Sequence, residues 1–174
     1  MRALHGLYLF LTGLWGGVLL AFTLGAGLVL RSAPSRQVGG IVNRALLDAL
    51  DVLSYVAVGL LFALFLALRR REDWPKLTRI LTPRLLVLMG VATIASHLLV
   101  TPEMVSLRDR MVVAVDLVPK EDPLRREWGR LHGISSLLLL GRLLGVANLF
   151  ALGFWAVPVT TYVVRPEDAT PSHS

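Results

Sequence analysis

Arg142 is the side chain whose position most needs a chemical explanation. It lies within a long apolar run near the end of the sequence, well after His132. A charge at membrane depth costs several kcal/mol unless it is paired or hydrated. We therefore predict that Arg142 pairs with Asp51, with Asp48 as the second choice; the alternative is that its long side chain reaches the membrane surface. The polar cluster predicted around this charge consists of Asp48, Asp51, Arg130, Ser135, Ser136 and Arg142.

Two histidines are candidates for cofactor binding. His97 interrupts the third apolar run, and His132 precedes the last one. Histidines on adjacent helices can hold a metal ion or ligate haem iron. The other interpretation is a histidine that forms a hydrogen bond within a helix bundle. The chain has no cysteine and no histidine pair spaced four apart. We therefore expect no cofactor, and we keep haem or copper bound by His97 and His132 as the alternative.

The most distinctive string in the chain is Arg130-Leu131-His132-Gly133-Ile134-Ser135-Ser136. On a helix, His132 and Ser136 are four residues apart and share a face. A serine beside a histidine is found in hydrolases, yet no carboxylate is placed to orient the histidine and no nucleophile elbow is present. Serine within a membrane span usually forms hydrogen bonds between helices. We therefore predict no catalytic residue and no enzymatic activity.

The apolar runs that contain these residues are long enough to cross a membrane. Hydrophobic residues make up 55% of the chain and charged residues only 17%, and four apolar runs lie near residues 5–30, 46–69, 84–101 and 131–160. A transmembrane helix needs about 20 apolar residues, whereas a signal peptide has an apolar region of about 7–15. We predict an all-α integral membrane four-helix bundle in up-down-up-down order, with both termini on one side. Residues 1–166 would form one domain and residues 167–174 a disordered polar tail.

Prolines punctuate the segments between the runs. The connector from Glu72 to Arg84 contains two prolines, which are expected to end the helices on both sides. Thr101-Pro102-Glu103 is typical of a helix start. The following segment, Met104 to Val118, is either an amphipathic helix between the third and fourth spans or an extension of the third span. Asp122-Pro123 predicts a last helix that begins before the bilayer, as a polar stub.

Small residues recur every four positions in the first span. They are Gly13, Gly17, Ala21 and Gly25. Such a stripe places small side chains on one helix face, where another helix backbone can approach closely. We predict that this stripe is a helix-packing face.

The net charge of +6 at pH 7 comes largely from arginines at the edges of the apolar runs. Anionic lipid headgroups explain these arginines better than nucleic acid, since no basic stripe has interleaved aromatic residues. Arg69, Arg70 and Arg71 directly follow the second run, which places that loop in the cytoplasm by the positive-inside rule. We predict a multi-pass protein of the bacterial inner membrane with cytoplasmic termini. Its partners would be the bilayer and either a second copy or another membrane protein, and not nucleic acid.

The chain resembles the transmembrane protein 205 family, whose bacterial members are classed as a domain of unknown function. The resemblance rests on Arg130-x-His132-Gly133-x-Ser135-Ser136, on Leu140-Gly141, and on Pro102 with Arg108 and Met111. A looser similarity connects it to copper-resistance D-type membrane proteins and to membrane-bound haem-containing protoporphyrinogen oxidases. The family often has asparagine where this chain has Ser96-His97. The resemblance implies a fold and a location rather than a reaction.

The sequence thus predicts a small non-enzymatic membrane protein. Such a protein would bind or move a small solute, or support a partner complex. The alternative is a haem- or metal-linked redox protein that uses His97 and His132.

Overall fold

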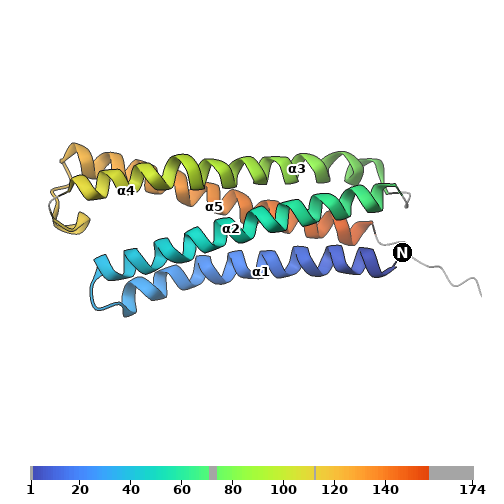
Figure 1. Ribbon diagram of the computed structural model, residues 1–174, viewed down its shortest axis with the longest axis horizontal. Coiled ribbons are helices and arrows are strands. Elements are labelled where there is room, and N and C mark those ends of the chain that lie inside the picture. Colours follow the sequence, from blue (N-terminus) through green and yellow to red (C-terminus); the bar gives the residue numbers. More distant parts are fainter. Residues whose placement is uncertain (1, 71–73, 112, 157–174) are drawn as a thin grey trace, which may run out of the picture.

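The computed structural model describes residues 2–70, 74–111 and 113–156, and in this part of the chain all regular structure is helical (Figure 1). Residues 157–174 lie outside the described residues, and with them the predicted polar tail. The helical elements are α1 (Arg2–Ser32), α2 (Arg36–Arg69), α3 (Lys76–Ile94), the π-helical segment η1 (Ala95–Val100), α4 (Thr101–Arg110), the 3₁₀ turn η2 (Val115–Leu117) and α5 (Pro123–Trp155).

Four helical stretches of the described chain are long and apolar enough to cross a membrane. They are Ala3–Ser32, Gln37–Arg69, Lys76–Arg110 and Pro123–Trp155. The predicted all-α fold with four spans is therefore confirmed. The helices are longer than the apolar runs because polar turns extend them beyond the hydrocarbon region, which is about 30 Å thick.

Side-chain caps set where two of the helices begin. Ser35 Oγ accepts a hydrogen bond from Val38 N (3.2 Å) and starts α2 directly after the turn that follows α1. Asp122 Oδ1 accepts from Leu124 N (2.7 Å), and Pro123 occupies the first turn of α5. Both serine and aspartate satisfy amide groups that have no partner within the helix. The predicted start of the last helix at Asp122-Pro123 is confirmed.

The third span differs from the prediction at its two prolines. Pro83 lies inside α3, which begins at Lys76, so the connector is shorter than expected. Pro102 lies in the first turn of α4, yet α4 continues directly from η1. Membrane helices tolerate proline because the freed backbone groups find other partners and the helix adjusts locally. The π turn before Pro102 is such an adjustment. The segment after Thr101 therefore begins as an extension of the third span, and helix α4 ends at Arg110.

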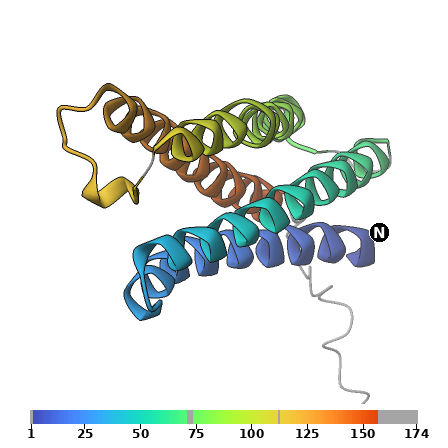
Figure 2. The same ribbon diagram turned by 60° about the vertical axis from the view of Figure 1, so that its left-hand side comes forward.

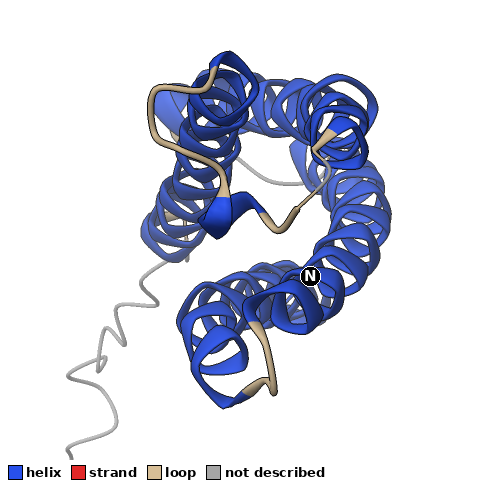
Figure 3. Ribbon diagram, turned by 90° about the vertical axis from the view of Figure 1, so that its left-hand side faces the viewer, coloured by secondary structure: helices blue, strands red, loops and turns tan. Residues whose placement is uncertain are grey.

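The four spans form a bundle in which each has two neighbours. α1 packs beside α2 and α5, and α3 packs beside the same two helices. α2 and α5 are therefore diagonal to each other across the centre. Figure 3, which looks along the bundle from the turn between α1 and α2, shows the helices arranged around a common axis. His5 Nε2 donates to Gly153 O (2.9 Å), so the start of α1 and the end of α5 lie at the same end.

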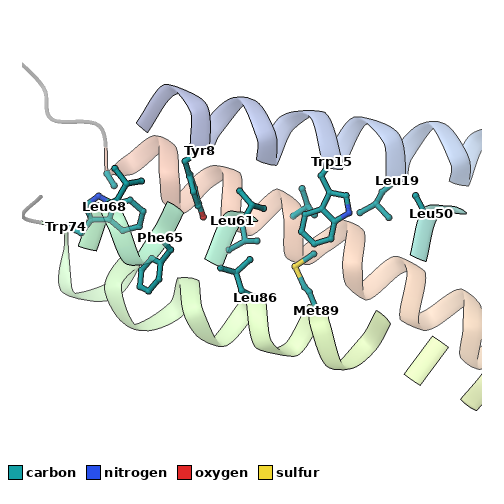
Figure 4. Packing of buried hydrophobic residues seen from close by; sticks show 13 residues of the cluster. Tyr8, Trp15, Leu19, Leu50, Leu61, Phe65, Leu68, Trp74, Leu86 and Met89 are labelled. Atoms are coloured by element: carbon teal, nitrogen blue, oxygen red, sulfur yellow. The ribbon is translucent and has the colours of Figure 1, made fainter. Parts of the chain in front are cut away.

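Aromatic side chains fill that end of the bundle (Figure 4). The Trp74 ring meets Tyr8 at a centroid distance of 5.9 Å and Phe65 at 5.7 Å, both in edge-to-face geometry. At the opposite end the α1–α2 pair separates from the α4–α5 pair (Figure 2). Leu107 of α4 and Leu131 of α5 form a second, smaller core there with Val100. The bundle is therefore closed at one end and divided into two helix pairs at the other.

The predicted small-residue stripe is not the main packing face of α1 within this chain. A Cβ at Gly17 or Gly25 would have no atom within 4 Å, and only Gly13 would make an ordinary contact, 3.6 Å from Phe150. The large side chains of the helix occupy the opposite face and bury against the bundle; they are Tyr8, Trp15 and Leu19. Within this chain, therefore, Gly17 and Gly25 do not bring another helix close.

Other glycines are responsible for the close helix contacts. A Cβ at Gly16 would lie 2.8 Å from Val146, and one at Gly145 would lie 2.7 Å from the sulfur of Met89. A Cβ at Gly153 would lie 2.8 Å from the Tyr8 ring. A Cβ closer than 3.0 Å would force the neighbouring side chain to move. The close approach of α5 to α1 therefore depends on Gly16 and Gly153, and its approach to α3 depends on Gly145.

Candidate functional site

An ion pair crosses the centre of the bundle. Arg142 of α5 donates from Nη1 to Asp51 Oδ1 of α2, and both side chains are fully buried. Since α2 and α5 are diagonal, the arginine side chain spans the axis to reach the carboxylate. The predicted pairing of Arg142 with Asp51 is confirmed. Asp48 instead forms an exposed pair with Arg44 on the same helix, with 3.9 Å between Asp48 Oδ2 and Arg44 Nε.

His97 adds a third polar group to this pair. Its Nδ1 lies 3.8 Å from Asp51 Oδ2, and its ring meets the Tyr55 ring edge-on at a centroid distance of 5.9 Å. His97 lies on the π-helical segment η1, and such segments are frequent at functional sites. Asp51 therefore faces a permanent cation on one side and an ionisable ring on the other.

Several buried polar atoms around the ion pair form no hydrogen bond with the described residues. Arg142 Nε and Nη2 are buried, and neither finds an acceptor among the described residues. These two groups form the parallel fork that binds a carboxylate or phosphate through two hydrogen bonds. Asp51 Oδ2 and Ser96 Oγ are likewise buried without a hydrogen bond in the described chain. Buried polar groups usually have hydrogen-bond partners, so the unpaired atoms of this cluster depart from the usual pattern.

A cavity of about 470 Å³ lies between the two helix pairs. Its walls come from residues 22–30 of α1, 40–47 of α2, 101–108 of α4 and 128–143 of α5. Leu47 and Leu143 line its inner end and are sequence neighbours of the ion pair, one turn from Asp51 and next to Arg142 respectively. A volume of this size is typical of small-molecule sites. We call it the inter-pair cavity.

The outer part of the inter-pair cavity is polar. Arg44 and Arg108 line it, and Arg108 reaches across from α4 so that its Nη1 would lie 4.0 Å from a Cβ at Gly40 of α2. The His132 ring stacks on Trp128 at a centroid distance of 5.2 Å. Asn43 Nδ2 donates to Ala26 O (3.0 Å) and ties α2 to α1 at the same wall.

The remaining predicted cluster residues lie at the cavity or outside it. Ser135 and Ser136 line the cavity, and Ser136 Oγ donates to His132 O (2.9 Å). That bond stays within one helix and leaves the hydroxyl without an activating base. Arg130 lies on the exposed side of α5 and pairs with Glu127 (2.8 Å). Ser135 and Ser136 therefore form part of the polar wall of the cavity, and they are not arranged as nucleophiles.

The two histidines are not brought together. His97 lies beside Asp51, the partner of Arg142, whereas His132 precedes Arg142 by ten residues of α5, about 15 Å along the axis. Residues 2–70, 74–111 and 113–156 contain no group of three or more histidine, cysteine and acidic side chains that could hold a metal ion. The arrangement does not favour one haem iron or copper ion held by both histidines.

The cavity residues Arg44, Arg108 and Trp128 were not predicted as site residues. In the sequence they are ordinary interfacial residues at the ends of apolar runs. Only the separation of the helix pairs brings them together, and no local pattern specifies that separation.

Comparison with known proteins gives one family. Residues 10–113 match the family model described as Domain of unknown function (DUF4149). The match takes in Asp51 and His97 and ends before α5, so Arg142 lies outside it. No curated protein and no solved structure matches the chain.

Proposed function

The chain belongs to the family Domain of unknown function (DUF4149), and we propose that it binds a small solute within the membrane rather than catalysing a reaction. The observation that supports this proposal most directly is the inter-pair cavity, whose wall includes Leu47 and Leu143 beside the buried ion pair. Ion pairs inside spans often mark solute or ion pathways. In this proposal the ion pair holds the diagonal helices in place, and the cavity holds the solute.

The proposal also covers the membrane in which the protein resides and the family that it resembles. We propose a bacterial inner-membrane protein of the transmembrane protein 205 type, with residues 1–166 as one domain and with cytoplasmic termini. Arg69 at the end of α2 supports this orientation, because basic residues beside a span favour the cytoplasm. A second copy or another membrane protein could pack on the exposed stripe of α1.

A cavity-filling substitution tests whether the cavity holds a solute. Ala26 lines the cavity, whereas Ala21 lies on the exposed side of the same helix. The full chain and the variants Ala26→Phe and Ala21→Phe are purified from membranes in a mild detergent and weighed by native mass spectrometry. Wild type and Ala21→Phe should retain a bound molecule of constant mass, and Ala26→Phe should lose it. If the wild type retains none, or if all three retain it equally, the cavity is not a binding site.

A further inference from the structure

We propose that the solute of the inter-pair cavity is an anionic membrane lipid, bound with its phosphate at Arg108 and Arg44 and with an acyl chain toward the bundle centre. This inference rests on the proposed function, because it names the class of molecule that the same cavity takes. Three properties of the cavity support it: its charge, its polarity gradient and its incomplete enclosure.

The charge of the cavity wall is positive. Arg44 and Arg108 line it, and none of the described lining residues is acidic. In the described part of the chain Arg108 forms no ion pair, and the contact of Arg44 with Asp48 is long, at 3.9 Å. Both guanidinium groups are therefore available to an anion. Arginine suits phosphate because its planar donors match two phosphate oxygens.

The polarity of the wall changes along the bundle. The outer part has Arg108 and Trp128, and tryptophan is enriched at the level of lipid headgroups. The inner part has Phe22, Leu139 and Leu143, which are apolar. Residues 128 and 143 of α5 are about 22 Å apart along the helix, so the cavity extends from headgroup level into the hydrocarbon region. An amphiphile with one charged end fits this gradient, whereas a uniformly polar solute does not.

The cavity is also only partly enclosed. Its lining residues Thr23 and Gly27 of α1, and Ser136 and Leu140 of α5, are exposed on the surface of the bundle. They lie on two helices that border the same cavity, and in a bilayer their exposed sides face lipid. A lipid can therefore enter from the membrane without passing through water, and its second acyl chain can stay outside.

A lipid competition measures the charge preference. The full chain is exchanged into detergent that contains equal amounts of dioleoyl phosphatidylglycerol and dioleoyl phosphatidylcholine, which have the same acyl chains, and bound lipid is counted by native mass spectrometry. The wild type should bind one phosphatidylglycerol with a preference of about tenfold. Both lipids present the same phosphate to the arginines, but phosphatidylcholine adds a choline cation that Arg44 and Arg108 repel. Arg108→Gln should reduce this preference to near equality.

Arg110→Gln is the matched control. Arg110 lies on the same helix, is exposed and does not line the cavity, so the variant removes the same charge and should keep the wild-type preference. Equal preference for the two lipids in the wild type would overturn the inference, as would an equal loss in Arg108→Gln and Arg110→Gln. Displacement of the lipid by inorganic phosphate alone would assign the site to a soluble anion and would also overturn it.

Different results would contradict the solute-binding proposal and the lipid assignment. If Ala26→Phe expels a bound molecule that is not an anionic lipid, the cavity still binds a solute and only the lipid assignment falls. Circular dichroism and thermal unfolding check that Arg108→Gln is folded. Should it not fold, Arg44→Gln serves as the second variant, because Arg44 is exposed and lines the same wall.

Discussion

Replacing Arg142 by leucine removes the cation from the centre of the bundle and leaves Asp51 buried beside His97 without its charged partner. Breaking a fully buried ion pair in this way costs about 3–5 kcal/mol, because one charge is left in a low-dielectric interior. Asp51→Leu should cost a similar amount for the same reason. The double variant carries neither charge and presents two apolar side chains to each other. Such replacements are often neutral, so its cost should stay below about 2 kcal/mol.

The measurement is reversible unfolding in mixed micelles, followed by circular dichroism, for the wild type, both single variants and the double variant. The expected coupling between the two sites is about 4 kcal/mol or more. Arg44 and Asp48 provide the control, since this pair is exposed and long at 3.9 Å and should show a coupling of about 0–1 kcal/mol. Additive costs at Arg142 and Asp51 would refute the reasoning, because they would mean that each charge is satisfied without the other.

Three further predictions concern packing, topology and cofactor content. Gly145→Leu should destabilise the bundle by about 1–3 kcal/mol, because the new side chain would overlap with α3. Gly17→Leu and Gly25→Leu should leave thermal stability unchanged. If Gly17→Leu abolished oligomers seen by size-exclusion chromatography, the stripe would be the contact with a second copy. Tags fused before α1 and after α5 should report the same side of the membrane in accessibility assays, and opposite sides would contradict a bundle of four spans. Purified protein should show no Soret band, and a band that disappears when either His97 or His132 is replaced would revive the haem alternative.

The fold could be predicted because it depends on the lengths of apolar runs. Four such runs specify four spans, and an even number of spans places the start of the first helix and the end of the last on the same side. The contact of His5 with Gly153 agrees with this. The Arg142 partner could also be predicted, since a charge in the hydrocarbon region requires a counter-charge and Asp51 lies at a matching depth. Both arguments use the membrane as a constraint, and neither needs a tertiary contact to be known.

The packing face of α1 and the inter-pair cavity could not be predicted in this way. In the first span, Gly16 and Gly17 are neighbours and look equivalent, yet only Gly16 meets another helix closely. The choice depends on which side the large residues such as Trp15 bury, and lipid and protein interior are equally apolar. Helix continuity through Pro102 likewise depends on local adjustment that proline statistics do not capture.

The diagonal ion pair also has a consequence for how the protein is made. Asp51 enters the membrane with the second span, but its partner is 91 positions further along the chain, on the last helix. The spans that precede α5 therefore contain a carboxylate that still lacks its permanent counter-charge. Insertion of α5 supplies that charge, so a helix that is synthesised after the other three spans completes their electrostatic balance. A chain interrupted before Pro123 should leave Asp51 exposed to quality control in the membrane, because an intramembrane charge without a partner distinguishes an unfinished bundle from a finished one.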